Sequence, residues 1–178
     1  FLETDFNGNR LPETLSLSLS SRYNNVYADN LKGKVQMELY NSEFELNDFG
    51  RDYEIKLTYS SGNMNNGKNG SMTLYDSDVE VVQAGNLDLS SKYSELKLDG
   101  AVNIKLDSYD DELEIRKVET LEGQAKYTEI SIINSMKNCN LTLYDSEVET
   151  GNIGTLNMDA KYTELETGTL RDFKGGQL

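Results

Sequence analysis

Tyrosine, lysine and acidic side chains return at regular intervals along the chain, and they are the residues best placed to do chemistry. The stretch "LYDSDVE" at positions 74–80 returns as "LYDSEVE" at positions 143–149. We expect tyrosines and lysines of one column to point outward, where neighbouring Lys and Tyr make cation–π contacts of about 0.5–1 kcal/mol each. Two roles are open to them: stabilising the sheet, or binding as an aromatic stripe that stacks on sugar rings or meets another protein. The candidate ligand-binding residues are Tyr40, Tyr75, Lys92, Tyr109, Lys126, Tyr144 and Lys161.

Carboxylates lie in pairs beside these tyrosines. The pairs are Asp76 and Asp78, Asp110 and Glu112, and Asp145 and Glu147. Like charges on adjacent strands repel, which invites a cation, and calcium takes about six to eight oxygen ligands. Because no loop carries a recognised calcium motif, the sequence favours a solvated face balanced by lysine and no cofactor, with calcium as the alternative.

Catalytic constellations are scarce in this sequence. The chain has no histidine, which removes Ser-His-Asp and Cys-His catalysis and the commonest zinc ligand. Its single cysteine, Cys139, falls in an apolar column, where a buried thiol is expected rather than a nucleophile. Paired carboxylates could hydrolyse glycosides, but nearly uniform short units leave no room for loops that would wall an active site. We therefore predict that the protein is not an enzyme.

The elements that must position these side chains are short repeats. Apolar residues recur every 17 or 18 positions and define nine units between residues 17 and 172. Counted from the first apolar residue of a unit, the apolar positions are 1, 3, 10, 12 and 15. Position 1 is occupied in turn by Leu17, Val35, Tyr53, Gly70, Leu87, Ile104, Leu121, Cys139 and Leu156.

This spacing predicts strands and tight turns rather than helices. A spacing of two is the strand period, and the change of parity between positions 3 and 10 requires a corner. A unit this short cannot hold a strand, a crossover helix and a return, so each unit forms one coil of a solenoid. The left-handed hexapeptide helix needs an apolar residue at every sixth position, which the columns lack. The predicted fold class is therefore all-β, a single-stranded right-handed parallel β-helix (β-solenoid) of about nine coils of 17–18 residues.

A second set of tyrosines occupies position 7 of alternate coils. When tyrosine is at position 7, position 5 is mostly small, and when tyrosine is at position 6, position 5 is mostly leucine. This exchange of volume predicts that position-7 tyrosines turn their rings partly inward. The residues concerned are Tyr23, Tyr93, Tyr127 and Tyr162.

Composition and the chain ends limit the partners. A net charge of −14 argues against nucleic acid or an anionic membrane, and no apolar run is long enough to span a bilayer. Residues 1–16 are expected to form an N-terminal cap and residues 17–178 the solenoid, in a single domain. The C-terminal coil lacks an evident cap, so self-association through the coil ends is a further possibility.

The regular coils, the acidic charge and Gly-Asn turns such as "AGNLDL" and "TGNIGTLNM" resemble the β-solenoid putative adhesins of bacterial envelopes, including the autotransporter-adhesin head type. This resemblance implies a non-enzymatic adhesion or binding module that is exported to the outer surface or periplasm and meets a glycan or a surface protein. A second resemblance is to bactofilins, cytoskeletal β-helices that polymerise end to end. A polysaccharide-degrading enzyme is the third alternative, since right-handed β-helices include pectin-degrading enzymes.

Overall fold

The computed structural model describes residues 16–29, 31, 33–47 and 52–174. The described part of the chain contains no helix, and therefore no apolar helix of the length needed to cross a membrane. Its strands are β1 (Leu17–Arg22), β2 (Asn25–Asp29), β3 (Val35–Tyr40), β4 (Glu43–Asn47), β5 (Tyr53–Thr58), β6 (Ser61–Asn66), β7 (Asn69–Tyr75), β8 (Asp78–Lys92), β9 (Glu95–Tyr109), β10 (Glu112–Lys126), β11 (Glu129–Tyr144), β12 (Glu147–Lys161) and β13 (Glu164–Phe173).

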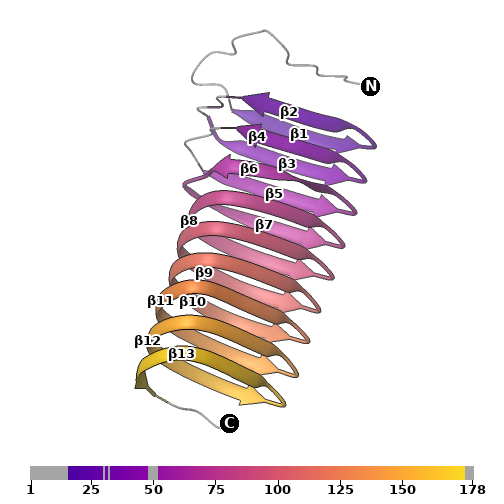
Figure 1. Cartoon of the computed structure of the whole chain (residues 1–178). Helices are drawn as coiled ribbons and strands as arrows, with labels where there is room; N and C mark the ends of the chain where they lie inside the picture. The colour runs from indigo at the N-terminus through magenta and orange to yellow at the C-terminus, as the bar shows by residue number, and fades with distance from the viewer. Residues whose placement is uncertain (1–15, 30, 32, 48–51, 175–178) are drawn as a thin grey trace.

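The strands stack as the coils of a parallel solenoid (Figure 1). One arm follows the order β1-β3-β5-β7-β8, and the other follows β2-β4-β6-β8. From β8 onward one long bent strand supplies part of both arms, and β8 to β13 pair in sequence order. Each coil lies one strand spacing, about 4.8 Å, from the next. The predicted right-handed parallel β-solenoid is confirmed.

The register of the strands reproduces the columns of the repeat. Leu17 pairs with Val35, Val35 pairs with Tyr53, and Tyr53 pairs with Gly70. Every pairing is parallel, so equivalent residues of successive coils lie side by side. Residues at the same position of successive units therefore form a ladder that runs along the rod.

The interior is filled by the apolar columns, and glycines accommodate its largest side chains. Phe44 and Tyr53 are both buried. A Cβ added at Gly62 would meet the ring of Phe44, and one added at Gly70 would meet the ring of Tyr53 at 2.5 Å. A large ring in one coil thus occupies the space that the next coil leaves empty, as a close-packed interior requires.

The C-terminal end of the solenoid leaves apolar side chains partly exposed. Residues 1–15 of the expected N-terminal cap lie outside the described residues. At the other end, β13 pairs with β12, and Leu165 and Leu170 pack only partly buried against the core. Phe173, in position 1 of a tenth unit, is 46% exposed. The last coil therefore presents part of an apolar interior to solvent.

Candidate ligand-binding surfaces

Every coil turns at position 7 through a left-handed backbone conformation. The residues at this position have φ between 47° and 60°. They are Tyr23, Asn41, Tyr59, Asp76, Tyr93, Asp110, Tyr127, Asp145 and Tyr162. Asn and Asp adopt this region with little penalty, whereas for other L-residues it costs roughly 1–2 kcal/mol. Tyrosine at position 7 must therefore gain contacts that offset the strain.

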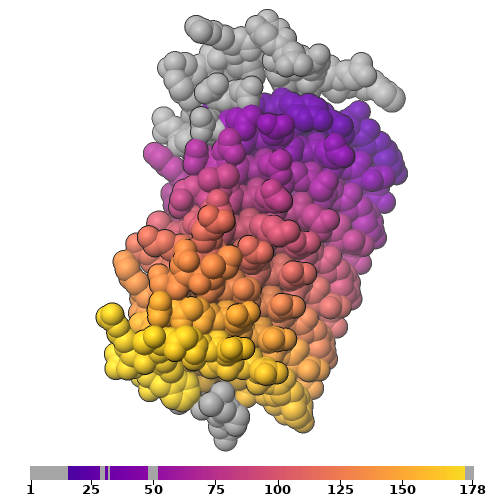
Figure 2. Space-filling model, in the orientation of Figure 1, coloured from indigo at the N-terminus to yellow at the C-terminus, as the bar shows by residue number. Residues whose placement is uncertain are grey.

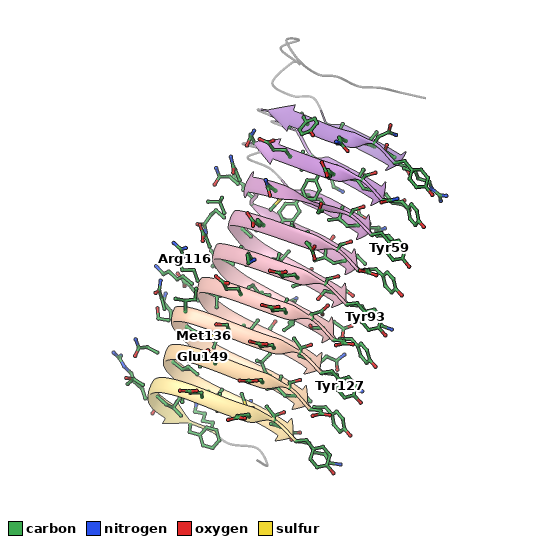
Figure 3. The ribbon with its side chains drawn as sticks, turned by 45° about the vertical axis from the view of Figure 1, so that its right-hand side comes forward. Tyr59, Tyr93, Arg116, Tyr127, Met136 and Glu149 are labelled. Atoms are coloured by element: carbon green, nitrogen blue, oxygen red, sulfur yellow. The ribbon has the colours of Figure 1, made fainter. Side chains whose placement is uncertain are left out.

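Those contacts come from one continuous ladder of nine tyrosine rings. Each ring meets the next edge to face, with centroids 5.4–5.8 Å apart and interplanar angles of 79–89°. We call this edge of the solenoid the tyrosine corner (Figure 3). It comprises Tyr23, Tyr40, Tyr59, Tyr75, Tyr93, Tyr109, Tyr127, Tyr144 and Tyr162.

The alternation of tyrosine between positions 6 and 7 explains the geometry of this ladder. Identical positions on adjacent coils would stack rings face to face at the strand spacing, which aromatic quadrupoles disfavour. Moving the ring by one position in every second coil permits the perpendicular arrangement. A cation then fills position 6 of some coils: Lys92 Nζ lies 4.7 Å from the Tyr93 centroid and 4.8 Å from that of Tyr109. The two-coil period of the sequence is thus the period of the ring packing.

The prediction that position-7 tyrosines turn inward is wrong. Tyr23, Tyr93, Tyr127 and Tyr162 are 69%, 42%, 45% and 70% exposed. The left-handed backbone at position 7 directs their side chains outward, into the same ladder as the position-6 rings. The small residues at position 5 therefore do not make room for these rings.

The position-6 candidates lie at the surface as expected, but their rings pack against one another. Tyr75 and Tyr109 are 39% and 37% exposed, and Tyr40 and Tyr144 are half-buried. Lys126 and Lys161 are exposed, while Lys92 is half-buried between rings. Neighbouring phenols also raise the pKa of the Tyr59 hydroxyl, with Tyr75 the largest cause. A ligand approaching the tyrosine corner would meet hydroxyl tips and ring edges more than open ring faces.

A ladder of polar side chains, seven of the nine buried, lies directly inside the corner, at position 8. Ser77 is typical: its hydroxyl donates to the carbonyl of Tyr75 at 2.9 Å and accepts the N–H of Ser60 at 3.1 Å. Its own N–H donates to Ser94 Oγ at 3.2 Å. Position 8 is occupied by Asn24, Ser42, Ser60, Ser77, Ser94, Asp111, Thr128, Ser146 and Thr163. These groups satisfy backbone donors that the turn removes from the strand ladder.

One member of this ladder is a buried carboxylate. Asp111 accepts the N–H groups of Ser94 at 2.8 Å and Tyr109 at 3.0 Å. It also accepts the hydroxyls of Ser91 and Ser108, both in position 5. Four donors thus surround the carboxylate. Because two of them come from position 5, this position is serine in these two coils, whereas it is leucine or alanine in the coils on either side.

Acidic side chains cover the arm that follows the corner. Position 9 stacks Glu95, Glu112, Glu129, Glu147 and Glu164 on consecutive coils. This arm faces the viewer in Figure 2, where the side chains of successive coils stand in rows. Within the described residues, no group of three or more acidic, Cys or His side chains is arranged to hold a metal ion. The calcium candidates Asp76, Asp78, Asp110, Glu112, Asp145 and Glu147 therefore have no supporting geometry.

Cys139 lies in the interior. It pairs with Leu121 and Leu156 in the position-1 column and is 2% exposed. Burial raises the pKa of its thiol to about 12. The neutral thiol is thus a core side chain, not an activated nucleophile.

A shallow groove crosses the opposite arm and was not foreseen from the sequence. It spans β7 to β11 and has a volume of about 600 Å³. We call it the polar groove; its side chains at positions 2 and 4 are Ser71, Thr73, Asp88, Ser90, Lys105, Asp107, Glu122, Asn140 and Thr142. Most side chains of these two columns are short and leave the space between the columns open, and Gly123 forms part of the lining.

Gly123 is the point at which this arm departs from the repeat. It stands in the position-3 column between Leu106 and Leu141, yet its φ is +141° and it is exposed. A Cβ at Gly123 would lie 1.9 Å from the carbonyl oxygen of Leu106. Only glycine fits this backbone, so the lining of the groove depends on it.

Comparison of the chain with protein-family models, with curated proteins and with solved structures finds no match.

Proposed function

We propose that the protein is a non-catalytic binding module that attaches to an extended, hydroxyl-rich chain such as a polysaccharide, in the manner of a cell-envelope adhesin. The observation that carries this proposal is the polar groove. It crosses five strands, about 19 Å at the strand spacing, and it is open along the rod. An extended polymer can therefore lie across several coils at once.

The chemistry of the groove suits a sugar chain. Ser90, Thr73 and Thr142 offer hydroxyls that both donate and accept hydrogen bonds, as sugar hydroxyls do. Asp88 and Asp107 add acceptors and Lys105 adds a donor. Between the described strands of β7 to β13, no loop is long enough to close over a bound chain, which favours holding a polymer over transforming it.

The tyrosine corner is the second candidate surface for the same function. Its seven candidates, Tyr40, Tyr75, Lys92, Tyr109, Lys126, Tyr144 and Lys161, lie on one edge of the rod. Edge-to-face contacts engage the rings of the four tyrosines, and Lys92 and Lys161 lie against neighbouring rings. We assign this edge chiefly to holding the coils in register, with ligand contact limited to its hydroxyl tips.

A glycan array tests the proposal. The wild-type chain is expected to retain one or more polysaccharide fragments of several residues, without releasing reducing or unsaturated ends from them. Chain cleavage would instead support the polysaccharide-degrading alternative. An array with no bound glycan, read with a folded protein verified by circular dichroism, would contradict the proposal.

A further inference from the structure

The broad bend opposite the tyrosine corner carries a cationic hollow on this otherwise acidic chain. Its volume is about 520 Å³, which lies within the range of roughly 300–1,000 Å³ typical of ligand sites. Three cations line it, Lys117, Lys137 and Arg171, against one carboxylate, Glu119. The lining therefore carries a net charge of +2, while the whole chain carries −14. We call this feature the basic hollow.

The backbone register explains why the hollow is open. Position 16 holds Lys137 on β11, Gly154 on β12 and Arg171 on β13, so glycine separates the two cations. A Cβ at Gly154 would lie 2.5 Å from the carbonyl oxygen of Lys137, which excludes any larger residue there. Lys137 and Arg171 therefore lie on strands two spacings, roughly 10 Å, apart, and Lys117 lies on β10, the neighbour of β11.

The free cations and neutral donors complete the site. Lys137 Nζ is held at 2.7 Å from Glu119 Oε2, and this hydrogen bond lowers the pKa of Glu119. Lys117 and Arg171 form no ion pair with any described residue. The neutral polar side chains of the lining are Ser135, Asn152 and Thr169. Hydroxyl and amide donors beside a lysine and an arginine match the oxygens of a sulfate, phosphate or carboxylate group.

We infer that the basic hollow binds the oxyanion group of an acidic carbohydrate, namely a sulfated, phosphorylated or uronate sugar. Arginine can grip such a group with two parallel N–H bonds, and lysine adds a point charge. The inference rests on the proposed function only in its choice of a carbohydrate as the carrier of the anion. The negative charge elsewhere on the chain would repel polyanions that do not fit the hollow.

Calorimetric titration at fixed ionic strength tests this inference with a sulfated oligosaccharide, a uronate oligosaccharide and a neutral one of equal length. The wild-type chain is expected to bind at least one acidic oligosaccharide about tenfold or more tightly than the neutral one. The double variant Lys117→Gln/Arg171→Gln should lose about tenfold or more of that affinity. Asn152→Trp, which fills the hollow without changing the charge, should lose it as well.

The matched control is Lys34→Gln/Lys68→Gln, which removes the same charge from exposed sites outside the hollow. Its affinity should stay within about twofold of wild type, because surface charges far from the ligand are screened. Equal losses in control and hollow variants, unchanged binding in the hollow variants, or no preference for acidic sugars would each overturn the inference.

Inorganic sulfate, followed by the ¹H–¹⁵N signal of Gly154, separates this inference from the proposed function. If the array is blank but sulfate shifts this signal in the wild type and not in Lys117→Gln/Arg171→Gln, the adhesin proposal and the choice of a carbohydrate both fail, while the anion site itself stands. If the array shows glycans whose binding the hollow variants leave intact, only the anion site fails.

Discussion

At the scale of single residues, the position-7 tyrosines combine backbone strain with ring contacts. Tyr93 has φ 57° and makes edge-to-face pairs with Tyr75 and Tyr109, each at 5.8 Å. Such pairs contribute about 0.5–1.5 kcal/mol each, which is comparable to the cost of the left-handed conformation. The contacts of the tyrosine ring with its neighbours thus offset the cost of the left-handed backbone conformation.

This balance predicts the order of two substitutions. Tyr93→Ala loses both ring pairs and keeps the strain, so it should lower the free energy of unfolding by about 1–3 kcal/mol. Tyr93→Gly loses the same contacts but relieves the strain, so it should be the more stable of the two by about 1 kcal/mol. Urea denaturation of both variants measures the difference. A Gly variant less stable than the Ala variant would show that the strain is not real.

The buried thiol of Cys139 predicts a loss of stability at alkaline pH. Burial raises its pKa from 9.0 to about 12, so the unfolded chain releases a proton that the native chain retains. The stabilisation is complete below pH 9 and is lost as pH rises toward 12, by about 1.4 kcal/mol per pH unit. Burial likewise raises the pKa of Tyr53 above 10.0, so Tyr53 adds a smaller decline that begins below pH 10, and the comparison with Cys139→Ala separates the thiol from it.

Urea denaturation of wild type and Cys139→Ala at pH 8, 9 and 10 measures this slope. The variant should show a shallower decline between pH 9 and 10, whatever its absolute stability. Parallel declines in the two proteins would mean that the native thiol titrates at its ordinary pKa.

At the scale of the element, the coil is the unit that the sequence predicts well. The apolar columns give the register because equivalent residues pair on adjacent strands, as Leu17 does with Val35. The orientation of the position-7 tyrosines was not predictable in this way, because a two-residue period says nothing of a left-handed residue between strands. The Ser and Thr residues of position 8 did carry a readable signal, because small hydroxyl residues recur beside seven of the nine corners. Gly123 lines the polar groove and Gly154 lines the basic hollow. Both glycines are visible in the sequence, but the close backbone approach at each of them is not revealed by the spacing of apolar residues.

Gly123 supplies a prediction at this scale. The position-3 column holds leucine on both sides of it, so the consensus replacement Gly123→Leu looks favourable from the repeat alone. The φ of +141° and the 1.9 Å approach of a Cβ to the Leu106 carbonyl oxygen exclude it. We expect Gly123→Ala and Gly123→Leu to lower the free energy of unfolding by about 1–3 kcal/mol or more. Thermal denaturation measures both, and a Leu variant as stable as wild type would contradict the assigned backbone.

At the scale of the whole molecule, the described coils end with the same type of corner. The first described coil carries Arg22 and Tyr23, and the last carries Lys161 and Tyr162. Stacking copies head to tail would place two position-7 tyrosines in succession and break the alternation of the ladder. The interior at β13 is partly exposed, with Phe173 46% exposed, which favours association of two molecules through that end. Because head-to-tail stacking breaks the tyrosine ladder, we do not expect growth into a filament.

Sedimentation velocity over a range of protein concentrations tests this expectation. We predict small species, monomer or dimer, without progressive growth. Continuous growth into filaments would favour the bactofilin-like scaffold instead. A charge placed in the exposed interior, Leu165→Lys, should leave a monomer and serves as the control for association through β13.

One titration tests most directly whether this molecule binds a polymer along the polar groove. A glycan selected on the array is titrated into wild type, Ser90→Trp and Tyr109→Ala. Ser90→Trp blocks the groove, and Tyr109→Ala removes a ring from the tyrosine corner on the same strand system. We predict that Ser90→Trp weakens binding about tenfold or more, while Tyr109→Ala stays within about threefold of wild type. The reverse order, with binding lost in Tyr109→Ala and kept in Ser90→Trp, would contradict the account and move the binding surface to the tyrosine corner.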